Sequence, residues 1–385
     1  MTNNNVVVFK EPERGASPLS LSPAQNAAVT TVLNWWLDPN RAPVFHLFGY
    51  AGSGKTTLAK YIVEAIKNER ETQVRYACFT GKASLVLDSK GCSPASTIHR
   101  LIYKPVIEDG KVVDFTLNND SDLFNTDLLI IDEVSMVGER IGQDLLSFDI
   151  PILVLGDPGQ LPPIEGAGFF NPDKPEVMLT EIHRQAEDNP IIRLATLARQ
   201  GKPLPLGSHG SSLVCTRAQL DQTPLDFDQT LCGLNKTRQG MNYRVRELMN
   251  LTSKVPQADE KLICLKNNYD TNYINGQMCR VRSVTELSSH LKFGLNDFDT
   301  DEVLAETYTP RGLFTGEEIA KQDWKYGDNK IDQFTYGYVI TCHKSQGSQW
   351  DRVLVFDQSD VFKETSQNWL YTAITRAAQS VTIVQ

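Results

Sequence analysis

The residues with the clearest chemical meaning form a glycine-rich segment, Gly49–Thr56, which matches the pattern G-x-x-x-x-G-K-[ST]. The segment follows an apolar run at Val44–Phe48 and precedes a helical pattern at Thr57–Lys67. Glycines in such a turn let backbone N–H groups converge on phosphate oxygens, and the helix N-terminus adds positive potential. We therefore expect a nucleotide phosphate site rather than an empty turn, with Lys55 on the β- and γ-phosphates and Thr56 on Mg²⁺. The other expected nucleotide contacts of the segment are Gly52, Gly54 and Thr57.

Two further polar groups follow apolar runs. Leu128–Ile131 leads directly into Asp132 and Glu133. At the end of a buried strand, Asp132 would reach the magnesium ion and Glu133 would take a proton from the attacking water, which favours a hydrolase over a transferase. Gln160 lies in a Pro/Gly-rich segment after another such run, and its amide could bond both the γ-phosphate and that water. A solvated glutamine in a turn is the alternative for Gln160.

The pattern around these residues predicts the elements that position them. Short apolar runs alternate with helical patterns, which is typical of a parallel sheet covered by helices. The first helix should begin at Ser22 and Pro23, with an apolar stripe through Ala27, Leu33 and Leu37. The predicted strands of the first half are Val44–Phe48, Gln73–Phe79, Leu128–Ile131 and Ile152–Leu155. A second series begins near Val177 and includes helices at Pro190–Arg199 and Gly240–Leu251, strands at Thr335–Thr341 and Val353–Phe356, and a closing helix and strand over Thr365–Val384.

Two segments interrupt this alternation. Val106–Val113 reads as a short β-hairpin with Asp-Gly at its turn. The stretch from Gln257 to Asp332 is β-like, with strands expected at Leu262–Leu265 and Gln277–Val284, and it predicts a small inserted β domain. This stretch is acidic near Asp297–Glu306, which makes it a poor binder of phosphate and favours a protein contact or a brace for the hairpin.

Composition sets the broad class. The chain of 385 residues has 41% hydrophobic and 22% charged residues and a mean hydropathy of -0.30, which predicts two or three soluble domains. The net charge of -9 excludes a protein coated in positive charge but leaves room for one basic groove. Seven scattered cysteines contain no C-x-x-C pair, so we expect neither a disulfide framework nor a zinc site. No apolar run approaches the roughly 20 residues that span a bilayer. We therefore expect an intracellular, cytoplasmic protein that does not bind membranes.

The order of these motifs along the chain resembles that of superfamily 1 helicases, in particular the RecD-like and Dda-like enzymes of the 5′-to-3′ branch. The resemblance implies an α/β fold with two RecA-like domains and ATP in the cleft between them. It also implies a short hairpin pin in the first domain and a small SH3-like β domain inserted in the second. The motifs that carry it, besides the three above, are Thr80–Ala83, Ser96–His99, Leu179–Arg184, His343–Gly347 and Tyr371–Arg376.

The resemblance divides the chain into domains. Residues 1–20 would be a flexible leader, and residues 21–176 a first RecA-like domain with the pin at about residues 100–122. The second RecA-like domain would comprise residues 177–256 and 334–385, and the SH3-like insertion would comprise residues 257–333. In that insertion, Cys279 stands where many RecD-like relatives have a second glycine.

Further site residues follow from the resemblance alone. Gln25 would read adenine, while Arg184 and Arg376 would reach the phosphates from the second domain. The single strand would lie on hydroxyls, amides and cations, which position phosphate and sugar without reading sequence. Tyr103, Phe115 and Trp350 are candidates for base stacking, with core packing as their alternative. The implied DNA contacts are Thr80, Lys82, Thr97, His99, Phe115, Asn235, Lys236, Arg238, His343, Lys344, Ser345 and Trp350.

The expected function is therefore that of an ATP-dependent DNA helicase that moves 5′-to-3′ on a single strand, with ATP and Mg²⁺ as cofactors. Two alternatives remain: an RNA helicase or RNA/DNA translocase of the same superfamily, and an ATP-regulated nucleic-acid-binding module that does not unwind. Expected partners are single-stranded and forked DNA, together with a single-strand-binding or replication protein, and the chain is expected to be a monomer. The compact layout favours a phage-encoded protein in a bacterial host.

The charges are expected to be separated in space. Basic side chains should gather along the strand path, and the acidic residues Asp120, Asp122 and Asp297–Glu306 should lie away from it. Binding to single strands should then weaken steeply with salt despite the acidic pI. The basic residues and the histidine placed on the path are Lys82, His99, Lys104, Lys236, Arg238 and Lys344.

Overall fold

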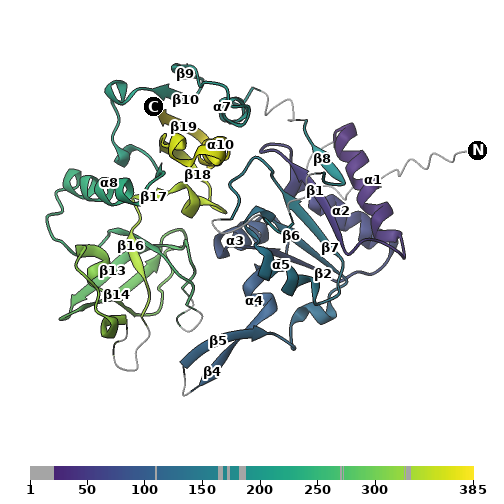
Figure 1. The fold of residues 1–385 in the computed structure, drawn as a ribbon, viewed down its shortest axis with the longest axis horizontal. Helices are drawn as coiled ribbons and strands as arrows, with labels where there is room; N and C mark the ends of the chain where they lie inside the picture. Colours follow the sequence, from purple (N-terminus) through teal and green to yellow (C-terminus); the bar gives the residue numbers. More distant parts are fainter. Residues whose placement is uncertain are drawn as a thin grey trace, which may run out of the picture.

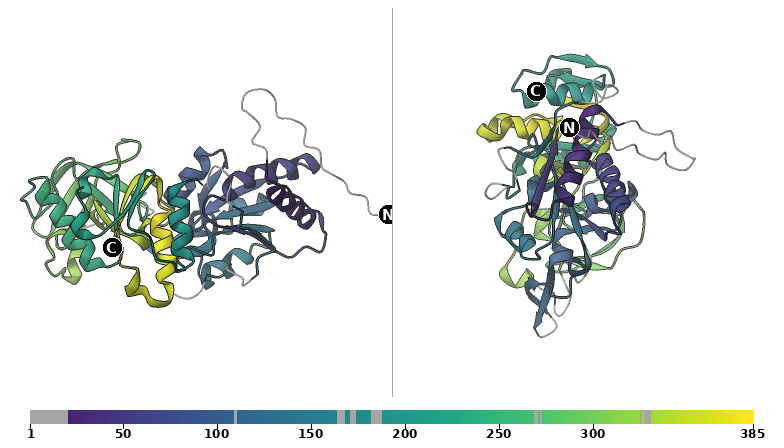
Figure 2. Two further views of the ribbon diagram at one scale, coloured as in Figure 1. Left: turned by 90° about the horizontal axis from the view of Figure 1, so that it is seen from above. Right: turned by 90° about the vertical axis from the view of Figure 1, so that its right-hand side faces the viewer.

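Two six-stranded sheets, a five-stranded sheet and a two-stranded hairpin organise the chain (Figure 1). The computed structural model describes residues 21–108, 111–163, 168–170, 174–181, 188–268, 271, 273–324, 326 and 331–385. The two large sheets lie side by side along the long axis of the molecule (Figure 2). No helix in this described part of the chain is both long and apolar enough to cross a membrane.

The first sheet is parallel throughout and has the order β3-β2-β6-β7-β1-β8. Strands β6 and β7 are wholly buried, which explains their unbroken apolar sequences. Each predicted strand of this half is present. The phosphate segment follows β1 and Asp132 ends β6, and β7 lies between these two strands. The bounds are β1 Val44–Gly49, β2 Val74–Cys78, β3 Ala95–Thr97, β6 Leu128–Asp132, β7 Ile152–Gly156 and β8 Val177–Leu179, with helices α2 Lys55–Glu69, α3 Gly81–Ser89, α4 Ile98–Ile102 and α5 Glu139–Leu146.

Helix α1, Pro23–Leu37, begins where the sequence predicts. Ser22 and Gln25 form a capping box in which each side chain accepts a hydrogen bond from the other's backbone N–H. The predicted apolar stripe was partly wrong, because Ala27 is exposed and Leu37 is 54% exposed. The buried face is instead formed by Ala28, Val29, Val32, Leu33 and Trp36.

The second sheet has the order β17-β11-β18-β19-β10-β9 and is parallel apart from β9. Helix α8, Asn235–Leu248, begins five residues before the predicted start at Gly240. The prediction was late because the first turns of the helix carry polar residues and show no apolar stripe. The other helices match the predicted positions. The bounds are β9 Gly207–His209, β10 Ser212–Cys215, β11 Gln229–Cys232, β17 Val339–Thr341, β18 Trp350–Phe356 and β19 Ala377–Val384, with α7 Pro190–Arg199 and α10 Ser366–Ile374.

The five-stranded sheet, called the small sheet below, is antiparallel and encloses its own aromatic core around Phe293 and Phe334. Its order is β15-β14-β13-β12-β16. The predicted strand Thr335–Thr341 is in fact two strands, because β16 ends in the small sheet at Tyr336 and β17 begins in the second sheet at Val339. The bounds are β12 Lys261–Cys264, β13 Met278–Glu286, β14 His290–Asp297, β15 Thr307–Pro310 and β16 Phe334–Tyr336, with helix α9 Gly312–Thr315.

The join between β16 and β17 is short and held in place. Only Gly337 and Tyr338 separate the two strands. The side-chain amide of Gln229 donates hydrogen bonds to the carbonyls of both residues, at 3.1 Å and 3.0 Å. The small sheet is therefore attached to the second sheet by a fixed connection.

The hairpin consists of β4, Tyr103–Glu108, and β5, Lys111–Leu117. It projects from the first half of the molecule beyond α4 (Figure 1). The strands pair along their length, from Tyr103 opposite Leu117 to Glu108 opposite Lys111. The predicted hairpin at Val106–Val113 is thus present, and its predicted Asp-Gly turn lies outside the described residues.

Candidate functional site: a phosphate cleft and a strand groove

The phosphate loop has the backbone that its glycines predict. Gly52 and Gly54 have φ values of 81° and 80°, a left-handed conformation that favours glycine. Helix α2 begins at Lys55, directly after Gly54. The Lys55 ammonium donates hydrogen bonds to the carbonyls of Gly49 and Tyr50, at 2.5 Å and 3.2 Å, so it lies over the loop. The helix N-terminus and this ammonium together suit a bound phosphate chain.

Two side chains whose oxygen atoms could bind a metal ion, Thr56 and Asp132, lie together beside the loop. The Thr56 hydroxyl donates to Asp132 Oδ2 at 2.9 Å, and the other oxygen of Asp132 accepts from the Glu133 backbone N–H at 2.8 Å. Mg²⁺ prefers hard oxygen ligands and in phosphate sites uses one or two protein groups together with the phosphates. Thr56 and Asp132 fit this requirement.

Glu133 faces the same space under unusual constraints. Its φ of 53° is in the left-handed region, a strained conformation for a residue other than glycine and one that is concentrated at functional sites. Its Oε2 atom is buried without a hydrogen-bond partner, and its Oε1 atom lies 3.7 Å from the Arg376 guanidinium. Burial raises the pKa of Glu133, and Arg376 partly opposes that rise. A carboxyl with a raised pKa and a free oxygen suits a general base.

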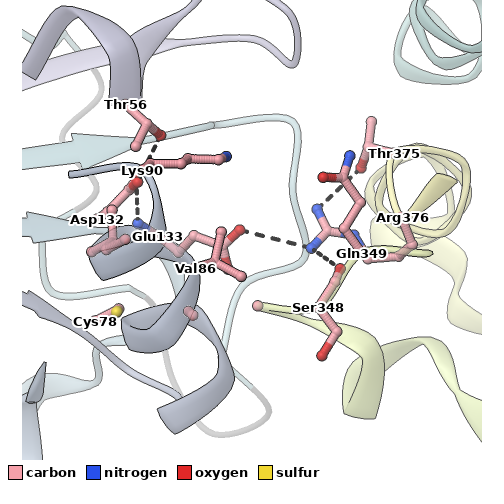
Figure 3. A pocket seen from close by; sticks show the side chains of 13 residues that line it. Thr56, Cys78, Val86, Lys90, Asp132, Glu133, Ser348, Gln349, Thr375 and Arg376 are labelled. Carbon is pink, nitrogen blue, oxygen red and sulfur yellow. Dashed lines mark hydrogen bonds and ion pairs between the residues drawn. The ribbon is translucent and has the colours of Figure 1, made fainter. Parts of the chain in front are cut away.

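Arg376 approaches from the second sheet (Figure 3). Its side chain is buried, and it donates to the backbone carbonyls of Thr372 and Ser348 at 3.1 Å and 3.2 Å. Arg376 and Glu133 both line a cavity of about 140 Å³, called the cleft cavity below. The residues that line it include Thr56, Lys90, Asp132 and Glu133 from the first half and Ser348, Gln349, Thr375 and Arg376 from the second.

Sequence reasoning missed several of these lining residues. Ser348 and Gln349 directly follow the His343–Gly347 motif, so its extension by two residues would have found them. Lys90 follows α3 and belongs to no motif, and nothing in its sequence context indicated the cleft.

Three other predicted nucleotide residues have different outcomes. Gln25 is buried beside the phosphate loop, where its amide donates to the Ser53 carbonyl at 3.1 Å and its oxygen accepts from Ser22. Its adenine contact stays a prediction. Gln160 lies in the described part of the chain but does not line the cleft cavity, so its contact with the γ-phosphate stays a prediction. Arg184 lies outside the described residues, so its predicted role is untested.

A second hollow, the strand groove, brings together half of the predicted DNA contacts. Thr80, Lys82, Thr97 and His99 line it from the first half of the molecule, and His343 and Lys344 line it from the second. The connection between β12 and β13 forms another wall, with Asn267, Ile274, Asn275 and Gly276. Sequence reasoning did not place this connection at the groove.

The polar residues of the groove are partly engaged in local structure. Thr80 and Thr97 are the N-caps of α3 and α4, and each side chain accepts a backbone hydrogen bond. His99 packs against Phe79, and burial lowers its pKa. Burial likewise lowers the pKa of His343. Both imidazoles are therefore uncharged at neutral pH.

The lysines of the groove contact the connections of the small sheet. Lys82 Nζ lies 3.1 Å from Asp299 Oδ2 and 5.1 Å from the centre of the Trp350 ring. Lys344 Nζ donates to the Leu265 carbonyl at 3.1 Å and to Asn275 Oδ1 at 2.6 Å, and burial lowers its pKa. The groove is thus closed on this side by the small sheet.

This arrangement corrects the prediction that the acidic residues lie off the strand path. Asp299, from the acidic stretch Asp297–Glu306, contacts Lys82. Asp120 lies 3.4 Å from Lys104, which was also placed on the path. Lys82 and Asp299 are far apart in sequence, and a sequence cannot show such pairing.

The other predicted DNA contacts do not line the groove. Asn235 and Lys236 are exposed at the start of α8, while Arg238 donates to the Thr335 hydroxyl at 3.2 Å. Ser345 is fully buried and donates to the Cys342 carbonyl, so its DNA contact stays a prediction. Trp350 lies beneath Lys82 at the start of β18, and Phe115 lies in β5 opposite Pro105.

Comparison with known protein families matches two segments of the chain. Residues 20–210 match the family model of an AAA domain, and residues 336–384 match that of a UvrD-like helicase C-terminal domain. The ATP-dependent RecD2 DNA helicase of Deinococcus radiodurans is 28% identical over 86% of this chain and 45% of its own length. The ATP-dependent DNA helicase Dda of Enterobacteria phage T4 is 36% identical over 40% of this chain and 37% of its own length. The chain thus spans less than half the length of both relatives.

Solved structures show the same fold over nearly the whole chain. A structure of two coordinating Pif1 helicases, described for unwinding at forked double-stranded DNA, matches with a TM-score of 0.57 at 19% identity and covers 94% of this chain and 92% of that one. Bacteroides Pif1 in complex with ADP-AlF3 and single-stranded DNA matches with a TM-score of 0.53 at 19% identity and covers 92% and 91%. The prediction of an α/β fold with two RecA-like domains is confirmed.

Proposed function

Because this chain belongs to the RecD-like group of superfamily 1 helicases, we propose that it hydrolyses ATP to move 5′-to-3′ along single-stranded DNA and to separate duplex DNA. The names of the RecD2 and Dda relatives state that they are ATP-dependent DNA helicases. The matched Pif1 structures include one bound to a nucleotide analogue and a single strand.

One observation carries the proposal: Arg376, beside the second sheet, lies 3.7 Å from Glu133, beside the first, and both side chains line the cleft cavity. An arginine at this place can stabilise the charge that develops on a transferred phosphoryl group. A carboxylate beside it can take the proton of the attacking water. Since the two groups stand on different sheets, hydrolysis depends on how closely the sheets approach.

The roles of the remaining residues follow from their chemistry. Lys55 and the backbone N–H groups of the loop would hold the phosphates, and Thr56 and Asp132 would hold Mg²⁺. The bound ion would neutralise charge on the β- and γ-phosphates. ATP that contacts both sheets favours a closed cleft, and hydrolysis removes part of those contacts. Repeated closure would move the strand groove along a single strand.

The phosphate loop is tested by Lys55→Ala. Removal of the ammonium should abolish ATP hydrolysis and unwinding, while binding to single-stranded DNA persists because Lys55 does not line the strand groove. Lys67→Ala is a matched control, since Lys67 is an exposed residue in the last turn of the same helix. Normal unwinding by the Lys55 variant would show that the loop has been assigned wrongly.

The polarity and the nucleic acid need separate measurements. Unwinding of two partial duplexes, one with a 5′ tail and one with a 3′ tail, determines the direction of movement, and preference for the 3′ tail contradicts the proposal. Stimulation of ATP hydrolysis by oligo-dT and by oligo-U determines the strand. A strong preference for oligo-U would favour an RNA helicase, because only RNA offers a 2′-hydroxyl.

A further inference from the structure

Tyr371, in α10, makes two hydrogen bonds that cross from the second sheet to the first half of the molecule. Its hydroxyl oxygen lies 2.7 Å from the Ala51 backbone nitrogen and 2.7 Å from Asp157 Oδ2. Tyr371 is 2% exposed and Asp157 is 4% exposed, so the bond between them is buried, and the bond to Ala51 is partly buried. Ala51 belongs to the phosphate loop, and Asp157 opens the loop that follows β7. One hydroxyl therefore joins α10 to two loops.

The direction of both bonds is fixed by their chemistry. A backbone N–H can only donate, so the Tyr371 oxygen accepts from Ala51. The hydroxyl hydrogen is then donated to the Asp157 carboxylate. Burial, together with the Asp157 charge, raises the pKa of Tyr371 and keeps the hydroxyl protonated. Bonds to a carboxylate in a buried chain of this kind are stronger than ordinary neutral ones.

The same helix contacts the loop after β7 at further points. The Asn368 amide approaches three consecutive carbonyls of this loop at 3.1–3.3 Å. Thr372 Oγ1 accepts from the Leu161 backbone N–H at 2.9 Å. The Tyr371 ring packs so closely on Gly159 that a Cβ there would lie 2.8 Å from the ring. Helix α10 therefore rests directly on this loop, and Tyr371 extends the contact to the phosphate loop.

Arg376 follows Tyr371 just beyond the end of this helix. Its guanidinium is held by the carbonyls of Thr372 and Ser348 and lies 3.7 Å from Glu133. Because Arg376 is fixed to its own half of the molecule, its distance from a bound phosphate depends on where α10 rests. A displacement of about 1 Å in an active site can lower a rate by about 10²-fold.

We propose that Tyr371 is a positioning residue for the ATP hydrolysis described above: its hydroxyl seats α10 on the phosphate loop and on the loop after β7, and thereby sets Arg376 at the γ-phosphate. The inference rests on the proposed function. Tyr371 acts through Arg376 and not on the nucleotide. The kinetic effect of losing the hydroxyl should therefore depend on the presence of that arginine.

Tyr371→Phe tests this inference because it removes both hydrogen bonds and keeps the ring. We expect the strand-stimulated kcat to fall roughly ten- to hundredfold. The KM for ATP and the Kd for oligo-dT should stay close to those of the wild type. Tyr273→Phe is a matched control: Tyr273 is also 2% exposed, and its hydroxyl donates to the Ala305 carbonyl at 2.6 Å within the small-sheet region. This control should retain the wild-type kcat.

A double-mutant cycle separates positioning from general stability. In an Arg376→Lys background, Tyr371→Phe should have little further effect, because the group that it positions is already lost. Asp157→Asn should reproduce the kinetic effect of Tyr371→Phe, because it weakens the same hydrogen bond. This variant replaces Tyr371→Phe in the test if the tyrosine variant does not fold.

Three results would overturn the inference: an unchanged kcat in Tyr371→Phe, an equal fold-loss in both backgrounds, or a loss shared by Tyr273→Phe. A wild-type protein without strand-stimulated ATP hydrolysis would overturn the proposed function as well. An active wild type with an unaffected tyrosine variant would overturn this inference alone.

Discussion

Arg376 extends from the second half of the molecule into the cleft cavity, beside Glu133. Replacement by alanine should lower the strand-stimulated kcat by roughly 10³- to 10⁵-fold, because a charge beside the transferred phosphoryl group is lost. Steady-state ATP hydrolysis with saturating oligo-dT measures this effect. Arg352→Ala is the control, and it should keep normal turnover, since Arg352 in β18 is 55% exposed and pairs with Asp228, which precedes β11.

The two buried histidines of the strand groove predict a pH dependence of stability. Burial lowers the pKa of His99 and His343 below the usual 6.5. The unfolded chain therefore takes up protons on these groups at a higher pH than the folded protein does. Their contribution to the free energy of unfolding is complete above pH 6.5 and is lost as the pH falls through and below that value.

Denaturation of the wild type and of the double variant His99→Gln/His343→Gln at pH 7.5 and pH 5.5 measures this contribution. Glutamine retains a polar side chain but does not titrate, so the variant should lose less stability than the wild type over this interval. Equal losses would show that other groups dominate the acid sensitivity.

At the scale of elements, the β4–β5 hairpin is the element for which we propose a role in separating the strands of a duplex. It projects from the first half of the molecule (Figure 1), as a structure that separates strands at a fork would. Phe115, in β5, is one of the three aromatic residues that we proposed for base stacking, together with Tyr103 and Trp350. Phe115→Ala should lower the unwinding rate roughly tenfold, the effect of about 1.4 kcal/mol of lost stacking, and lower ATP hydrolysis less.

Parallel measurements of unwinding and of strand-stimulated ATP hydrolysis test this role for the hairpin. Phe124→Ala is the control, because Phe124 is an exposed aromatic residue of the same half that lies outside the hairpin. Equal losses of the two activities in the Phe115 variant would count against a pin.

The sequence predicted elements best where burial alone determines them. Strands β6 and β7 are unbroken apolar runs and were found at almost their true bounds. Helix α8 was found late, because its first turns are polar. The split between β16 and β17 was not seen, since a strand pattern does not record which sheet each half joins.

The candidate site shows the same division. The phosphate loop, Asp132 and Glu133 were identifiable because they follow strands in a fixed order. The bond of Tyr371 to Ala51 spans 320 positions, and the pair of Lys82 and Asp299 joins two different sheets. Such contacts arise only when the sheets are brought together.

At the scale of the whole molecule, the acidic residues behind the net charge of -9 are not all separated from the basic groove, contrary to what the sequence had led us to expect. Asp299 contacts Lys82 of the strand groove at 3.1 Å, and we expect it to compete there with a DNA phosphate. Asp299→Asn removes this competing charge. We expect the Kd for oligo-dT to decrease by up to about fivefold at low salt, as befits a partly exposed ion pair.

Fluorescence titrations over a range of salt concentrations measure this difference between the Asn variant and the wild type. Asp301→Asn is the control, because Asp301 lies in the same loop but pairs with Arg280 at 3.5 Å. The gain should disappear at high salt, where the ion pair is screened. A gain of the same size in both variants would indicate a general effect of charge.

The short join between β16 and β17 has a mechanical consequence. A module on a long linker samples many positions, and its contacts depend on an effective concentration. The small sheet lacks that freedom, since one connection has two residues and the other is held by the buried ion pair of Arg246 and Glu260. A change in the angle between the large sheets should therefore displace the Asp299 loop from α3 by a set amount. If the proposed hydrolysis of ATP changes this angle, the small sheet should open and close the groove as it moves with the second sheet.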